Sequence, residues 1–131
     1  MQRVTGIGGV FFKARDPEGL RAWYKRHLGL DVQDWGGLAF APPPTQPEGS
    51  RSPLASHTTW CIFSADSDYF GGTRSAPFMI NYRVADLDAL LAVLRREGCA
   101  VDDKTEASEY GRFGWVTDPE GNRVELWQPP G

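Results

Sequence analysis

Two segments of the chain, residues 9–14 and 79–84, carry apolar residues at every second position and align with each other at an offset of 70 (79 − 9). A two-residue period predicts a strand with one buried face. The buried positions are Val10, Phe12 and Ala14 in the first segment and Ile80, Tyr82 and Val84 in the second. The chain therefore contains an internal repeat, and both copies begin with a strand.

Each strand is followed by a pattern typical of an amphipathic helix. Asp16, which precedes a proline, and Asp86 are placed to cap the helix N-termini, and Gly29 and Gly98 are placed to end the helices. Apolar and aromatic residues recur between them at helical spacing. They are Leu20, Trp23, Tyr24, His27 and Leu28 in the first copy, and Leu87, Leu90, Leu91 and Leu94 in the second. Charged residues between these positions, such as Arg21, are expected to face solvent.

Shorter strand candidates follow each helix. In the first copy they are residues 30–40, broken by a hairpin turn at Gly36 and Gly37, and residues 58–63; in the second they are 100–102, 112–117 and 124–127. The order is βαβββ twice, which predicts an α+β chain folded as a single domain over residues 1–131. Its two modules cover about 4–64 and about 78–130.

Two stretches interrupt the pattern. Residues 41–57 hold five of the ten prolines, and proline does not pair inside a sheet, so this loop is either a flap over a cleft or a floppy insertion. Residues 64–77 link the modules. Within this link, Asp66 and Asp68 are interpreted as turn residues.

Composition narrows the functional classes. The 131 residues carry 14 basic and 17 acidic side chains, a net charge of −3, which argues against a nucleic-acid-binding protein. No apolar run approaches the ~18 residues of a membrane helix. Cys61 and Cys99 lack the spacing of a metal finger or a redox motif, so we expect reduced thiols and a cytoplasmic protein.

The faces of the two repeated strands that look away from the helices mix apolar and polar residues. They carry Gly9, Phe11 and Lys13 in the first copy and Met79, Asn81 and Arg83 in the second. Because Phe11 and Met79 are apolar, we favour a cleft that binds a ligand. The alternative is a face open to solvent, as in many antiparallel sheets.

The repeated βαβββ order, the segment DPEGNRVEL at 118–126 and the segment YRVADLDA at 82–89 resemble the vicinal oxygen chelate superfamily. This superfamily includes glyoxalase I, extradiol dioxygenases, and fosfomycin-resistance and bleomycin-resistance proteins. The resemblance covers nearly the whole chain outside the proline-rich loop. It implies a glyoxalase/bleomycin-resistance-like fold, with curled mixed sheets around a cleft, and commonly a homodimer.

Metal-dependent members of the superfamily hold a divalent ion, which acts as a Lewis acid, between the first and last strands of two modules. The resemblance places the ligand positions at Gly9, Met79 and Glu125, with a fourth near Trp60 or Cys61. Glycine has no side chain, and a thioether is a poor ligand for Mg, Mn, Fe or Zn. We therefore expect no metal cofactor. The alternative is a shifted site with Glu125, His57 and Cys61 as its ligands.

The cleft is expected to bind a small organic molecule directly. Two groups of residues are expected to bind it. The apolar walls of the cleft come from Phe11, Trp60, Met79 and Trp127. Hydrogen-bond donors for an anionic or oxygen-rich compound come from Lys13, Asn81, Arg83, Arg112 and Arg123. Glu125 is the candidate catalytic residue, a general base if burial raises its pKa. Alternatively, Glu125 only forms an ion pair with Arg83 or Arg112 across the sheet.

These observations favour a small-molecule binding or resistance-type protein without a complete metal site. One alternative is an enzyme of the same superfamily, either a metal-dependent lyase, isomerase or dioxygenase, or a metal-free enzyme that uses Glu125 as base. A third possibility is a domain that binds only protein partners. Serine hydrolase and nucleotide-binding motifs are absent from the sequence.

Overall fold

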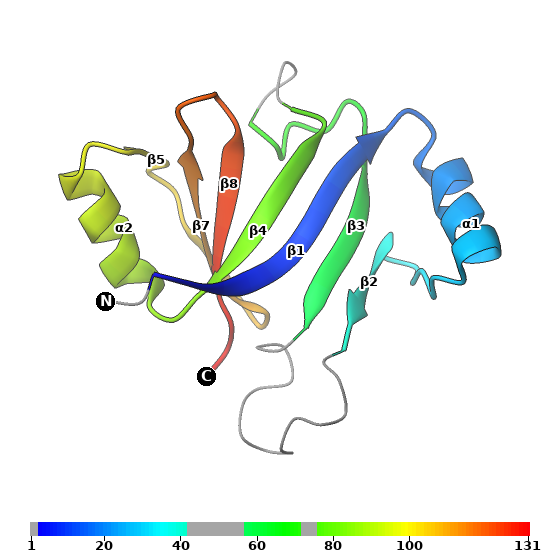
Figure 1. Ribbon diagram of the computed structural model, residues 1–131, viewed down its shortest axis with the longest axis horizontal. Coiled ribbons are helices and arrows are strands. Elements are labelled where there is room, and N and C mark those ends of the chain that lie inside the picture. Colours follow the sequence, from blue (N-terminus) through cyan, green and yellow to red (C-terminus); the bar gives the residue numbers. More distant parts are fainter. Residues whose placement is uncertain (1–2, 42–56, 72–75) are drawn as a thin grey trace.

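The computed structural model describes residues 3–41, 57–71 and 76–131, and within them eight strands form one curved sheet that does not close into a barrel (Figure 1). The strand order is β2-β3-β1-β4-β8-β7-β5, with β6 paired to β7. The strands are β1 (Val4–Ala14), β2 (Gly37–Phe40), β3 (Thr58–Ser64), β4 (Phe78–Val84), β5 (Ala100–Val101), β6 (Glu106–Ser108), β7 (Gly111–Thr117) and β8 (Arg123–Gln128). The helices are α1 (Pro17–Leu28) and α2 (Leu87–Arg96).

The two copies of the repeat meet through their first strands. β1 pairs with β4 in antiparallel fashion, and Val10 lies opposite Ile80. The predicted caps are confirmed, because the Asp16 and Asp86 carboxylates accept hydrogen bonds from backbone N–H groups of α1 and α2, each at 3.1 Å. Gly29, just past α1, has a φ of +69°, a conformation that favours glycine. The α+β class and the repeated strand–helix order are therefore as predicted.

The first module lacks one predicted strand in its described part. Residues 30–36 are irregular, and β2 begins only at Gly37. Local hydrogen bonds explain the difference: the Gln33 N–H donates to the Gly37 carbonyl at 2.8 Å, and the Gly36 N–H donates to the Gln33 carbonyl at 3.0 Å. The backbone groups needed for a ladder are thus engaged in turns. In the second module, the short β6 is a strand that the sequence pattern did not predict.

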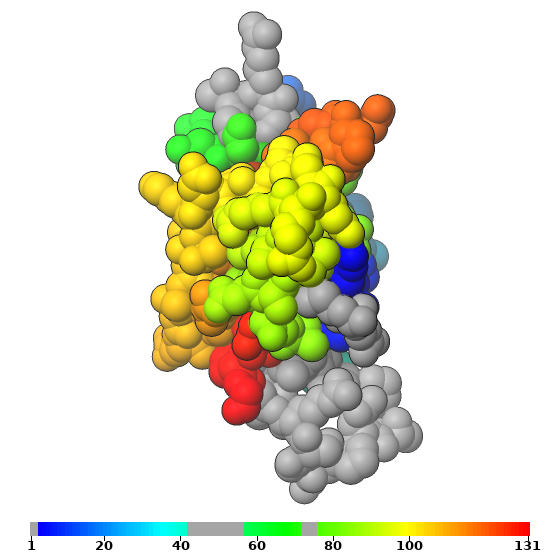
Figure 2. All heavy atoms as spheres, turned by 90° about the vertical axis from the view of Figure 1, so that its left-hand side faces the viewer, coloured from blue at the N-terminus to red at the C-terminus, as the bar shows by residue number. Residues whose placement is uncertain are grey.

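A compact apolar core lies between α2 and the sheet. Leu87, Leu90 and Leu91 of α2 are buried against Val84 and Leu126 of the sheet. β7 contributes a glycine, residue 114, whose missing side chain leaves room for the end of the leucine side chains. Figure 2 shows α2 and the turn after it covering this side of the molecule.

The packing of α1 is looser, and none of its residues is buried. Tyr24 contacts Phe12 of β1 and Trp60 of β3 edge to face, with ring centroids 6.1 and 5.0 Å away. Arg21 does not face solvent as predicted. Its guanidinium donates to the carbonyls of Gly36 at 3.1 Å and Ile62 at 2.8 Å, because those carbonyls lie beneath the helix within reach of this long side chain.

Nearly all of the proline-rich loop 41–57 lies outside the described residues, so its prediction as a flap or a floppy insertion stays a prediction. Neither helix in the described part of the chain has the length and hydrophobicity of a membrane span.

Candidate functional site

The face of the sheet that lies opposite the two helices is called here the helix-free face. At its centre a cluster of apolar side chains is buried. Phe11 of β1, Met79 of β4 and Trp115 of β7 form one buried cluster with Phe70. Phe70 comes from the segment after β3, which folds back over the sheet. The predicted apolar lining of this face is therefore present, but in this structure it packs against residue 70.

Glu125 of β8 points from the same face into this cluster and is only 1% exposed. Three side chains donate hydrogen bonds to its carboxylate. The Tyr69 hydroxyl and the Trp115 indole N–H reach Oε2 at 2.5 and 2.9 Å, and the Asn81 amide reaches Oε1 at 2.7 Å. A buried carboxylate is tolerated when its oxygens are paired in this way.

Burial has the largest effect on the pKa of the Glu125 carboxyl group. Loss of solvation raises the pKa of Glu125, while the bonds from Tyr69, Asn81 and Trp115 and the charge of Arg123 act in the opposite direction. Burial and the neighbouring carboxylate also raise the pKa of the Tyr69 phenol, so it stays a proton donor. The sequence-based expectation for a desolvated Glu125 is thus confirmed in direction, and the alternative of an ion pair with Arg83 or Arg112 is wrong.

The raised pKa of Glu125 predicts a specific pH dependence of stability. A carboxyl group with a raised folded-state pKa contributes stability below the unfolded-state pKa of about 4.3, and this contribution is lost as pH rises through the folded-state pKa. The free energy of unfolding of the wild type relative to Glu125→Gln should therefore fall as the pH rises above about 4. Urea denaturation at several pH values measures this difference; a constant or rising difference would contradict the pKa direction.

The side-chain amide of Asn81 also has an oxygen atom in this buried region. Its side-chain oxygen Oδ1 is buried and has no hydrogen-bond partner among the described residues. Gly8, at an irregularity in the β1–β4 ladder, leaves the space that Oδ1 occupies, since a Cβ there would lie 2.2 Å from it. Unpaired buried acceptors are rare, and such an atom has capacity for one more donor.

A polar pocket of about 570 Å³ opens on the outer side of the residues that cover Glu125. Tyr69 and Trp115 belong to its wall, so two of the donors to Glu125 separate it from the pocket. Arg123 also lines it, paired with Asp102 at 2.7 Å and lying over the Trp115 ring at 4.7 Å. The remaining lining residues are Asp68, Val101, Asp103, Lys104 and Glu106, and we call this site the acidic pocket.

The two tryptophans predicted to line the cleft lie on opposite faces of the sheet. Trp60 was expected in the cleft, but it lies on the helix side of the sheet against Phe12 and Tyr24. Trp127 does lie on the helix-free face, where it is buried and stacks on Phe113.

The predicted donors are engaged elsewhere. Arg83 donates to the carbonyls of Ile7 and His57, and Arg112 pairs with Asp88. The Lys13 ammonium lies 5.2 Å from the centroid of the Phe70 ring. In the described part of the chain these three cations therefore contact carbonyls, a carboxylate and an aromatic ring, and their role as donors to an anionic ligand stays a prediction.

The side chains at the superfamily's metal positions do not fit a divalent cation. Gly9 has no side chain, and a Cβ there would lie 2.9 Å from the Phe11 ring, so a ligating side chain at this position would have to displace that ring. Met79 is fully buried in the cluster. No group of three or more His, Cys, Asp or Glu side chains in the described residues is placed to hold a metal ion. His57, Cys61 and Glu125 are thus not brought together as the shifted site requires.

Tyr69 and Phe70 are the site residues that the sequence reasoning missed. They lie in the link between the modules, which was interpreted only as turns. Two adjacent aromatic residues in an otherwise polar, glycine-containing link are a usable signal, because large aromatic side chains bury more area than a solvent-exposed link needs.

Together, the open curved sheet and the two repeated strand–helix units define the fold class of the vicinal oxygen chelate superfamily. The profile of the glyoxalase-like domain matches residues 9–127, and the chain belongs to this family. No curated protein matches the sequence.

Solved structures with the same fold include methylmalonyl-CoA epimerase from Mycobacterium tuberculosis, with a TM-score of 0.65, 19% identity, and coverage of 100% of this chain and 92% of that one. A variant of the Streptomyces coelicolor methylmalonyl-CoA epimerase, in complex with 2-nitronate-propionyl-CoA, has a TM-score of 0.68 at 15% identity, with coverage of 98% and 99%. A glyoxalase/bleomycin resistance protein/dioxygenase superfamily member from Vibrio splendidus 12B01 has a TM-score of 0.53 at 11% identity, with coverage of 91% and 95%. At these identities the likeness establishes the fold alone.

Proposed function

We propose that the chain binds a small organic molecule in the acidic pocket beside Glu125 and does so without a metal ion. The observation that carries the proposal is the state of Glu125, whose two oxygens already accept hydrogen bonds from Tyr69, Asn81 and Trp115. A cation at Oε2 would have to displace the Tyr69 or Trp115 donor, and a cation at Oε1 would lie beside the N–H group of the Asn81 amide. Catalytic metal sites generally need about three protein ligands, and the neighbouring positions Gly9 and Met79 supply none.

The charges around the pocket favour a cationic or hydroxyl-rich ligand. Asp68, Asp103 and Glu106 line it together with Lys104, while Arg123 is paired with Asp102. Carboxylates accept hydrogen bonds from ammonium and hydroxyl groups, and aromatic edges add apolar contact. In this proposal the chain sequesters a small molecule, like the bleomycin-resistance branch of the superfamily that the sequence resembles.

Metal analysis and a ligand screen test this proposal. The purified protein should contain much less than one equivalent of metal by mass spectrometry, and Zn²⁺, Mn²⁺ or Mg²⁺ should leave its Tm unchanged.

Cationic organic compounds should raise the Tm, and the paired substitution Asp103→Asn with Glu106→Gln should reduce that rise. Asp31→Asn, outside the pocket, is the control. Stoichiometric, tightly bound metal, or a rise that is the same in both variants, would contradict the proposal.

A metal-free enzyme is a second candidate function. The raised pKa of Glu125 suits a general base, and the unpaired Oδ1 of Asn81 is an acceptor for a substrate donor. For an identified ligand that is turned over, Glu125→Gln should abolish turnover and leave the Kd within about twofold, since an amide cannot take up the proton. Unchanged turnover would remove Glu125 from the mechanism.

A homodimer belongs to the same proposal. β2 is the end strand of the described sheet, and two large apolar side chains, Trp35 just before it and Phe40 at its end, are 57% and 42% exposed. Exposed apolar groups next to an open strand edge favour pairing with another chain.

A further inference from the structure

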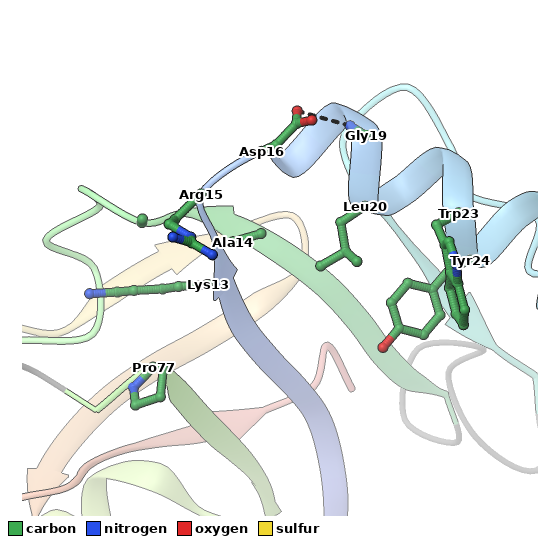
Figure 3. Close-up of a pocket in the computed structure, with 10 residues that line it drawn as sticks. Lys13, Ala14, Arg15, Asp16, Gly19, Leu20, Trp23, Tyr24 and Pro77 are labelled. Carbon is green, nitrogen blue, oxygen red and sulfur yellow. Dashed lines mark hydrogen bonds between the residues drawn. The ribbon is translucent and has the colours of Figure 1, made fainter.

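A second hollow lies between the beginning of α1 and the end of β1, with a volume of about 870 Å³. It shares no lining residue with the acidic pocket. Figure 3 shows Lys13 and Arg15 on one side of this hollow, and Leu20, Trp23 and Tyr24 of α1 on the other. We call it the α1 hollow.

The internal repeat explains why this space is open. At the offset of 70, Pro17 and Arg21 of α1 stand where α2 has Leu87 and Leu91, both of which are buried. The proline ring is smaller than leucine, and the Arg21 guanidinium turns aside to the carbonyls of Gly36 and Ile62. The first module therefore lacks the two leucines that seat the equivalent helix on the sheet.

The α1 hollow combines an apolar wall with a cationic side. Trp23 is 49% exposed, and Leu20, Tyr24 and Pro77 extend the apolar surface beside it. The Asp16 carboxylate, also at the rim, is engaged by the Gly19 N–H at 3.1 Å. Arg15 is exposed and has no hydrogen-bond or ion-pair partner among the described residues, so its guanidinium is the available charge at this site.

We propose that the α1 hollow binds a small organic carboxylate with an apolar body, of the aryl or short alkyl acid class. The carboxylate pairs with the planar guanidinium of Arg15, which presents two parallel N–H donors. The apolar body packs against Leu20 and Trp23 and covers surface that is otherwise exposed to water. This site and its ligand class are separate from the acidic pocket, whose charges favour the opposite sign.

Nuclear magnetic resonance of ¹⁵N-labelled protein tests the proposal with sodium phenylacetate as the probe. The amides of residues 13–16 and 18–24 and the Trp23 indole N–H should shift on titration, while the Trp115 and Trp127 indoles should not. Phenylacetamide, a neutral probe of the same shape, should bind about three- to fivefold more weakly, since an exposed ion pair contributes little more than that. Inorganic phosphate should not reproduce the shift of the Trp23 indole.

Two matched variants on the same part of the chain separate charge recognition from general binding. Arg15→Gln should weaken phenylacetate about three- to fivefold and leave phenylacetamide unchanged. Arg26→Gln, which removes an exposed charge of α1 outside the hollow, should change neither affinity. Because both substitutions are on exposed side chains, neither should alter the fold, and the amide spectra report that directly.

Several outcomes would overturn the proposal. They are equal affinity for the acid and the amide, equal affinity in the wild type and Arg15→Gln, shifts centred on Trp115, and a phosphate response equal to that of phenylacetate. A Trp23 indole that does not respond because a second copy of the chain covers it, as sedimentation at the same concentration would reveal, also overturns it. None of these results bears on the metal content or the cationic ligands of the acidic pocket, so the two proposals fail separately.

Discussion

Replacing Glu125 with leucine should lower the free energy of unfolding by about 4 kcal/mol, because it leaves several buried donors without an acceptor. The Tyr69 hydroxyl, the Trp115 indole and the Asn81 amide all lose their bond to this carboxylate. The surrounding aromatic cluster admits little water to replace it. Urea denaturation followed by circular dichroism near neutral pH measures the change.

Glu125→Gln is the matched control for that result. Glutamine has the same shape and keeps one oxygen, which can accept from Tyr69 and Trp115, so the expected loss is about 1–2 kcal/mol. If leucine and glutamine cost the same, the negative charge rather than the acceptor is what the donors require. If leucine costs less than about 1 kcal/mol, the three donors find other partners, and the buried network described around Glu125 is not maintained in solution.

Leu90→Ala should destabilise the chain by about 3 kcal/mol, whereas Leu20→Ala, at the equivalent position of the first copy, should cost only about 1 kcal/mol. Leu90 is 2% exposed in the core beneath α2, while Leu20 is half-buried beside the α1 hollow. Removing a buried side chain leaves a cavity as well as losing its transfer free energy. The same denaturation experiment compares the two variants.

The losses in the two variants can be compared directly, because both substitutions remove the same atoms from a helix at equivalent positions of the repeat. Equal losses would mean that α1 is seated on the sheet as firmly as α2. That result would also remove the packing difference from which the α1 hollow was derived.

Much of the fold follows from local patterns. The two-residue period places Phe12 and Tyr82 on the helix side and Phe11 and Met79 on the other, and the structure agrees. The helix boundaries were predictable because the capping aspartates and the terminal glycines act within a few residues. An internal repeat adds a second, independent indication of each element.

The remaining features depend on contacts between distant segments. β3 carries Trp60, Cys61, Ile62 and Phe63 in succession, so alternation could not assign its faces, and Trp60 was placed on the wrong one. The fold-back of residue 69 onto Glu125 joins positions 56 apart in sequence. No local period reports such a contact.

The bond from Tyr69 to Glu125 also makes the second copy of the repeat depend on the link that precedes it. The phenol belongs to the segment that follows the first copy, and the carboxylate to the last strand of the second. The second copy on its own would therefore keep the buried carboxylate of Glu125 but lose one of the three donors that pair with it.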